Sequence, residues 1–102
     1  MTAEYLIWIP NSFTPNGDGK NDFWPPYPLG VNIDEKTFVM YIYNRWGELV
    51  YQSTDMTKRW NGTMNNKGSF DDVVMDTYIY KISLKDLDGI KHEYFGHVNL
   101  IP

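Results

Sequence analysis

The chain has 102 residues, a formal net charge of −4 and no cysteine. This length suits one domain with one modest core, and the lack of cysteine excludes disulfides, thiolate chemistry and cysteine-ligated zinc. The acidic balance is not that of a nucleic-acid-binding protein, and no basic run or long apolar stretch indicates contact with or insertion into a membrane.

The first third of the chain predicts short strands and a structured loop. Residues 5–9, YLIWI, are apolar and aromatic and predict a strand that ends before Pro10. A polar, glycine-rich loop follows at residues 13–22. Prolines at positions 25, 26 and 28 then exclude both a helix and a central strand, and residues 29–33 are predicted to form a short edge strand.

The middle of the chain predicts a hairpin. Residues 38–43 are apolar on both faces, which indicates a central strand. Residues 44–47 predict a tight turn with Gly47 at positive φ, and residues 48–52 return as the hairpin partner. Residues 53–76 are polar and rich in turn-forming residues.

Two long strands are predicted towards the end of the sequence. Residues 77–85 alternate, with one set of side chains on one face: Tyr78, Tyr80, Ile82 and Leu84. Residues 86–89 predict a turn, and residues 90–101 a final strand. Gly96 lies inside this last strand, where it indicates a bulge or a close backbone approach.

This spacing of strands and turns predicts an all-β fold, an antiparallel β-sandwich of about seven strands. The strands at 38–43 and 77–84 are expected at its centre. Aromatic residues make up 17% of the chain, and without cysteine the core must be built on them. Trp46 and Trp60 are the tryptophans expected to fill it.

The loop FTPNGDGKND, Phe13 to Asp22, has two interpretations. As a turn, it depends on Asn16-Gly17 and Asp18-Gly19, because glycine and short Asx side chains tolerate positive φ, while Pro15 fixes its own φ.

The second interpretation of this loop is a weak calcium site. Alternating positions offer oxygen ligands at Asn16, Asp18, Lys20 and Asp22. The acidic first ligand and the bidentate acidic last ligand of a twelve-residue calcium loop are missing, since Thr14 and Pro25 occupy those positions. Both interpretations stay open, so the expected cofactor is either none or calcium.

Five blocks of the sequence resemble, in order, the gliding-motility-associated C-terminal domain. This is the type B C-terminal domain of proteins exported by the type IX secretion system of Bacteroidetes. The blocks are FTPNGDGKND at 13–22, IYNRWGELVY at 42–51, WNG at 60–62, TYIYKI at 77–82 and GHVNLI at 96–101. The motif positions are Phe13, Pro15, Asn16, Gly17, Asp18, Gly19, Asn21, Asp22, Asn44, Arg45, Trp46, Gly47, Trp60, Gly62 and Tyr78.

The resemblance implies an immunoglobulin-like sandwich that sorts its parent protein through the type IX machinery to the cell surface or medium, by way of the periplasm and outer membrane. Residues 1–102 are then expected to be one C-terminal sorting domain, excised from a longer secreted protein that lies on its N-terminal side, and a monomer. Two features depart from the family pattern. DDVVMD at 71–76 replaces a proline-rich turn, and no basic residue follows the last strand.

Two other function classes are alternatives to sorting: a carbohydrate-binding or adhesion module, and an enzyme. A carbohydrate-binding or adhesion module would stack sugars on exposed tryptophans, at Trp8, Trp24, Trp46 and Trp60. An enzyme is not expected, because no nucleophile motif or phosphate loop occurs, and His92 and His97 are five apart on one predicted strand and so point to opposite faces unless Gly96 forms a bulge.

Arg45 has its own pair of interpretations. Its guanidinium could stack on Trp46 or Tyr43, or it could brace the opening loop through Asp18 or Asp22. A structural brace is preferred here over a finger that binds a partner.

Overall fold

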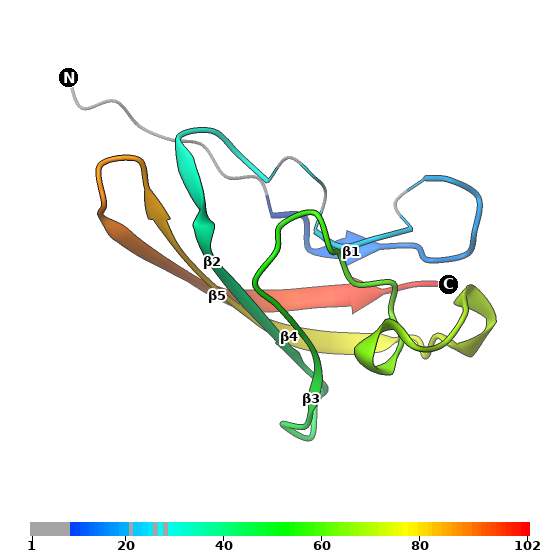
Figure 1. Cartoon of the computed structure of the whole chain (residues 1–102). Helices are drawn as coiled ribbons and strands as arrows, with labels where there is room; N and C mark the ends of the chain where they lie inside the picture. Colours follow the sequence, from blue (N-terminus) through cyan, green and yellow to red (C-terminus); the bar gives the residue numbers. More distant parts are fainter. Residues whose placement is uncertain (1–8, 21, 26, 28) are drawn as a thin grey trace.

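The structure, a computed structural model, describes residues 9–20, 22–25, 27 and 29–102. Five strands form one mixed sheet in the order β1-β5-β4-β2-β3 (Figure 1). Their bounds are β1 Ser12–Phe13, β2 Ile33–Tyr43, β3 Leu49–Ser53, β4 Asp76–Asp86 and β5 Lys91–Leu100. Two single 3-10 turns, η1 Met64–Asn66 and η2 Phe70–Asp72, lie between β3 and β4.

The two strands predicted at the centre are both interior strands of this sheet. β4 pairs antiparallel with β5 along its length, from Asp76 opposite Leu100 to Lys85 opposite Lys91. β2 pairs with β4 on one side and β3 on the other. The short β1 adds a parallel pairing at the outer edge of β5, which the sequence patterns did not predict.

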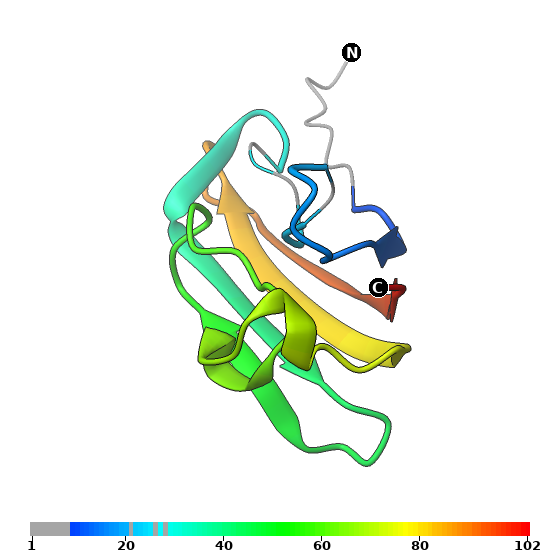
Figure 2. The ribbon, with the colours of Figure 1, turned by 90° about the vertical axis from the view of Figure 1, so that its right-hand side faces the viewer.

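One face of the sheet carries the core. Along β2, β4 and β5 the buried residues alternate with more exposed ones, and the buried strand residues are Phe13, Phe38, Met40, Ile42, Val50, Tyr51, Tyr78, Ile82, Leu84, Val98 and Leu100. The alternation predicted for residues 77–85 is therefore confirmed. Side chains from the loops close this face, among them the fully buried Trp24 and Trp60. Figure 2 looks onto the loops, with the curved sheet behind them.

The predicted sandwich of about seven strands is confirmed only as an all-β fold. In the described ranges the strands form a single five-stranded sheet, and loops rather than a second sheet cover its core face. The predicted strand at 5–9 lies outside the described residues except for Ile9, which is in no strand. The predicted edge strand at 29–33 is wrong, since only Ile33 is extended in a strand, as the first residue of β2.

Gly96 marks a close approach and not a bulge, the two possibilities that the sequence left open. The register between β4 and β5 is continuous through the pair Tyr80 and Gly96, so no bulge occurs there. A Cβ on Gly96 would lie 2.6 Å from the Tyr80 Oη and 2.8 Å from its Cζ, because the phenol ring lies over the glycine. The glycine therefore makes room for an aromatic ring that packs 4.9 Å from Trp24, measured between ring centroids.

Candidate functional site

The opening loop is wrapped around one carboxylate. Asp22 is buried, and its Oδ1 accepts backbone N–H bonds from Asn16 at 3.1 Å and Gly17 at 3.0 Å. Its Oδ2 accepts the N–H of Gly19 at 2.7 Å. Three backbone donors thus satisfy the buried charge, and the two glycines at positive φ aim their N–H groups inward.

The other oxygens predicted as calcium ligands also accept hydrogen bonds within this loop. Asn16 Oδ1 accepts from the Asp18 N–H at 3.1 Å, and Asp18 Oδ1 accepts from the Lys20 N–H at 2.8 Å. These bonds are Asx-turns, which favours the turn interpretation. Within the described part of the chain, no three acidic, histidine or cysteine side chains form a group that could hold a metal. Asn21 lies outside the described residues, and calcium stays a prediction.

The opening loop and the WNG block pack against each other. The Phe13 ring lies 5.4 Å from the Trp60 ring between centroids, and both side chains are buried. Gly62, at φ +96°, lies so close to its neighbours that an added Cβ would be 2.8 Å from Leu100 and 3.2 Å from Pro15. The glycine is required both for its backbone conformation and for this contact.

Trp60 holds the centre of the loop layer. Its backbone exchanges two hydrogen bonds of 2.9 Å with Trp24, and its indole donates to the Thr63 carbonyl at 2.8 Å. The prediction that Trp60 fills the core is confirmed, because none of its surface is exposed.

The turn between β2 and β3 is built by Asn44 and Gly47. The Asn44 Oδ1 accepts the N–H groups of Trp46 at 3.0 Å and Glu48 at 2.9 Å, and its carbonyl accepts the Gly47 N–H. Gly47 has φ +80°, as predicted. These bonds fix the tip of the hairpin without any contribution from the side chains of Arg45 and Trp46.

The prediction that Trp46 fills the core is wrong. Its side chain is 80% exposed at the hairpin tip, because the tight turn carries it beyond the end of the sheet. The Arg45 guanidinium carbon lies 5.1 Å from the Trp46 ring centroid, so the expected stacking occurs. The expected brace to Asp18 or Asp22 does not, since Arg45 Nε lies 3.5 Å from Asp76 Oδ2.

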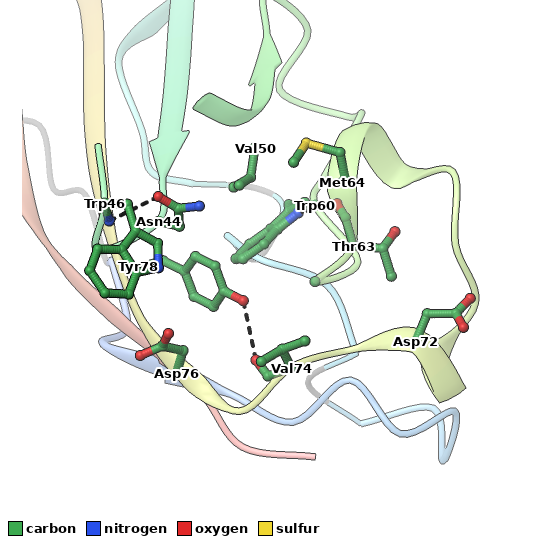
Figure 3. A pocket seen from close by; sticks show the side chains of 11 residues that line it. Asn44, Trp46, Val50, Trp60, Thr63, Met64, Asp72, Val74, Asp76 and Tyr78 are labelled. Atoms are coloured by element: carbon green, nitrogen blue, oxygen red, sulfur yellow. Dashed lines mark hydrogen bonds between the residues drawn. The ribbon is translucent and has the colours of Figure 1, made fainter. Parts of the chain in front are cut away.

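Residues from three motif blocks meet around one pocket beside this turn (Figure 3). The pocket has a volume of about 310 Å³ and combines an apolar floor with a partly polar rim. Motif residues that line it are Asn44, Trp46, Trp60, Gly62 and Tyr78. The opening-loop residues do not line it, although Phe13 and Pro15 support its floor through Trp60 and Gly62.

Tyr78 forms part of the pocket wall. Its hydroxyl donates to the Val74 carbonyl at 3.2 Å, and its ring meets Trp60 edge-on with centroids 4.8 Å apart (Figure 3). Burial raises the pKa of this hydroxyl, so it stays protonated as a donor at neutral pH.

Several pocket residues lie outside the motif blocks and were missed. They are Thr63, Met64, Asp72, Val74 and Asp76, of which the three between 72 and 76 belong to the divergent stretch DDVVMD; Val50 also lines the pocket and lies inside the block at 42–51. No periodicity or motif indicates them. The missed residues belong to the segment between β3 and β4 and to the first residue of β4, which line the pocket together with residues of the β2–β3 hairpin.

The three tryptophans that the structure describes do not form the platform expected of a carbohydrate-binding module. Trp24 and Trp60 are fully buried, and Trp8 lies outside the described residues. Trp46 alone presents an exposed indole among the tryptophans that the structure describes. Because β5 has no bulge at Gly96, His92 and His97 lie on opposite faces of the strand as predicted, and His92 contacts Asp86, which does not line the pocket, at 2.9 Å.

Comparison with known proteins places these features in a family. The family model described as CHU_C type IX secretion signal domain matches residues 7–100. The match spans all five motif blocks except Ile101, the last residue of the final block, and agrees with the resemblance that those blocks carry. No curated protein matches the chain.

Proposed function

The chain belongs to the CHU_C type IX secretion signal domain family and is a sorting domain for type IX secretion; from this premise we propose how it does its work. It directs a cargo protein on its N-terminal side across the periplasm and outer membrane to the cell surface or medium. Its partner is a component of the secretion machinery, which reads the folded domain. The domain acts as a monomer and catalyses no reaction.

The observation that carries this proposal is the convergence of the motif blocks. Asn44 and Trp46, Trp60 and Gly62, and Tyr78 come from segments far apart in the sequence, yet they line one pocket. The opening loop packs directly behind them through Phe13 and Pro15. We propose that this end of the sheet, which we call the motif end, is the surface that the machinery reads.

Export of a reporter tests this function. A fluorescent protein with a periplasmic signal peptide, followed by this domain, is expected outside cells that have the type IX system. The same reporter without the domain is expected to stay in the periplasm, as is the full fusion in cells without the system. Periplasmic retention of the folded fusion in competent cells would contradict the proposal.

The finer fold prediction, an immunoglobulin-like sandwich, also stays a proposal. The layer that contains Trp24 and Trp60 lies where a second sheet would pack, and one backbone bridge between these two residues already pairs its segments.

In the described residues no helix is long and apolar enough to cross a membrane.

A carbohydrate-binding or adhesion function is the alternative. Only the exposed indole of Trp46 supports it, because the two other described tryptophans are buried. A titration with soluble polysaccharide should leave the tryptophan fluorescence unchanged if sorting is the function, whereas saturable quenching that Trp46→Ala abolishes would support the alternative.

Calcium in the opening loop is a separate proposal with its own test. A cation would have to compete with the backbone N–H groups that Asn16, Asp18 and Asp22 already accept. We therefore expect equal melting temperatures in chelator and in millimolar calcium. A rise of about 5–10 °C in calcium that disappears in Asp18→Ala would establish the site, since ligation at tenfold the dissociation constant adds roughly 1.4 kcal/mol.

A further inference from the structure

The two hairpins of the sheet are built alike, which separates structural from non-structural residues in the turns. In the β4–β5 turn, Asp86 Oδ1 accepts the N–H groups of Asp88 at 2.9 Å and Ile90 at 3.0 Å. Asn44 does the same for the residues two and four places on. Each turn also has a glycine at positive φ three places after the Asx residue, Gly47 or Gly89.

This comparison leaves Arg45 and Trp46 without a role in forming the turn. The equivalent positions in the β4–β5 turn are Leu87 and Asp88, so the turn geometry requires neither an arginine nor a tryptophan. The Trp46 side chain is exposed at the tip of the β2–β3 turn, and the hydrogen bonds to Asn44 hold the backbone of this turn in place. Exposed tryptophan on a rigid element is typical of a binding anchor.

The charges around the pocket indicate the sign of its occupant. Two of the described lining residues are acidic, Asp72 and Asp76, and none of them is basic. The Asp76 carboxylate and the Trp46 ring both contact Arg45, whereas Asp72 accepts the Ser69 N–H at 2.8 Å. Asp76 is therefore the carboxylate placed to meet an incoming cation.

The uncharged polar groups of the pocket are already in use. The Asn44 oxygen accepts two N–H groups, and its amide nitrogen donates to Glu48 Oε1 at 2.8 Å. The Tyr78 hydroxyl donates to Val74. A ligand rich in hydroxyl groups, such as a sugar, would find only the second Asn44 N–H and the Tyr78 oxygen free among these atoms, while a cation needs only a carboxylate and an aromatic face.

Arg45 shows that these two features do bind a guanidinium. It lies over the Trp46 ring and against Asp76, but at 3.5 Å, with 63% of its side chain exposed. Exposed ion pairs of this kind contribute little to stability and exchange easily. A second cation can therefore share or replace this contact.

We propose that the pocket binds an arginine or lysine side chain that a protein partner presents between apolar residues. The aliphatic stem packs against Trp46 and the exposed Val74, and the charged group pairs with Asp76 while Arg45 moves aside. This rests on the proposed sorting function, in which the partner is part of the secretion machinery.

The first test uses defined peptides and the folded domain. A pentapeptide with a central arginine between leucines is titrated, and the indole N–H of Trp46 is followed by NMR, with the buried indoles of Trp24 and Trp60 as internal controls. The arginine peptide is expected to shift the Trp46 signal in a saturable way. The same peptide with neutral citrulline is expected to bind roughly two- to fivefold more weakly, as the loss of one exposed ion pair implies.

Three variants then locate the contact. Trp46→Ala and Asp76→Asn are each expected to weaken binding roughly two- to fivefold. The asparagine keeps an oxygen that can accept the Thr77 N–H. Binding to these variants is measured from the NMR signals of the backbone amides of residues 72–76. Arg45→Gln is expected to tighten binding by a similar factor, because Asp76 loses its competitor. The matched controls are Phe95→Ala, another exposed aromatic, and Asp71→Asn, an exposed acid beside the pocket; both should bind as the wild type does.

Any of three results would overturn the proposal. The first is no shift at about 10 mM peptide, where millimolar binding would be evident, or equal shifts with arginine and citrulline. The second is weaker binding by Arg45→Gln, which would make Arg45 a finger directed at an acidic partner. The third is a saturable shift with a neutral hexasaccharide and none with the peptide, which would make the pocket a sugar site.

Measuring export of variant reporter fusions tests this inference separately from the sorting function. The double variant Trp46→Ala with Asp76→Asn is expected to be exported several-fold less than the wild type, while Phe95→Ala with Asp71→Asn is exported normally. Equal export of both doubles would overturn the assignment of the pocket to the secretion partner and leave the sorting function standing. Retention of the wild-type fusion would contradict sorting, and the peptide titration would still decide the chemistry of the pocket.

Discussion

At the scale of single residues, the motif blocks contain two kinds of position. Asp22, Asn44 and Gly62 are explained by backbone contacts: a buried carboxylate with three N–H donors, an Asx-turn, and a glycine in close contact with its neighbours. Arg45 and Trp46 satisfy no such requirement. A family motif therefore combines residues that build the loop with residues that the loop presents.

Gly62 gives a prediction of stability. In Gly62→Ala the added Cβ would lie 2.8 Å from Leu100 Cδ1 and 2.9 Å from Val73 Cγ1, in a backbone with φ +96°. Overpacking of about 1–3 kcal/mol and a left-handed penalty of about 1–2 kcal/mol should together lower the free energy of unfolding by roughly 2–5 kcal/mol. Urea denaturation measures it.

Gly47→Ala is the matched control for Gly62→Ala. Gly47 has φ +80°, but its Cβ would meet nothing within 4 Å. Only the backbone penalty of about 1–2 kcal/mol is expected there. Equal losses in the two variants would show that the contact of Gly62 with Leu100 and Val73 has no energetic weight.

At the scale of elements, the two hairpins use the same turn with different chemistry. The Asx residue is neutral Asn44 in the β2–β3 turn and ionisable Asp86 in the β4–β5 turn. Asp86 also accepts a hydrogen bond from His92 through Oδ2 at 2.9 Å. This bond, followed by the N–H bonds from Ile90 and Asp88, lowers the pKa of the Asp86 carboxyl.

The lowered pKa predicts a stability that depends on pH. Because the carboxylate is favoured in the folded state, its contribution is complete above the unfolded pKa of about 3.9 and disappears as the pH falls through the folded pKa. Urea midpoints of the wild type should therefore fall below about pH 4. Asp86→Asn should be less stable at pH 6 and show a shallower fall.

Asp88→Asn is the control for this pH dependence. Asp88 lies in the same turn, but it contributes its backbone N–H rather than its carboxylate. Its variant should follow the wild-type pH profile. Identical profiles for the wild type and Asp86→Asn would mean that Asp86 does not couple folding to pH.

At the scale of the whole molecule, a single sheet is stabilised by a layer of loops. Trp24 and Trp60, from loops more than thirty residues apart, pair through two backbone bonds and bury both indoles against the sheet. The indole of Trp24 also donates to the Pro10 carbonyl at 2.7 Å. Large aromatic side chains thus do for this face what a second sheet does in a sandwich.

Two tryptophans of the same pocket should therefore differ in their effect on folding. Trp60→Ala removes a fully buried indole and should lower the free energy of unfolding by about 3–5 kcal/mol, a large part of the stability of a domain this size. Trp46→Ala removes an indole that is 80% exposed and should change it by less than about 0.5 kcal/mol. Thermal and urea unfolding measure both, and a comparable loss from Trp46→Ala would contradict its assignment as a binding residue.

The sequence by itself determined the local structure. Period-two alternation identified β4, the run at 38–43 identified the second half of β2, and the turns predicted at 44–47 and 86–89 are the two hairpin turns, because these features depend on neighbours along the chain. The motif blocks likewise identified the family that the comparison found. Burial of Trp60 was also predicted correctly.

Only the tertiary structure decided which motif residues are buried and which are presented. Trp46 and Trp60 are the same residue type in neighbouring blocks, yet one is exposed and the other is not, because Trp46 lies in the five-residue turn beyond the last strand pair, Tyr43 with Leu49. The β1–β5 pairing, the bridge between Trp24 and Trp60, and the ion pair of Arg45 with Asp76 all join residues distant in sequence. Such contacts depend on how the loops return across the sheet, and no local pattern encodes that path.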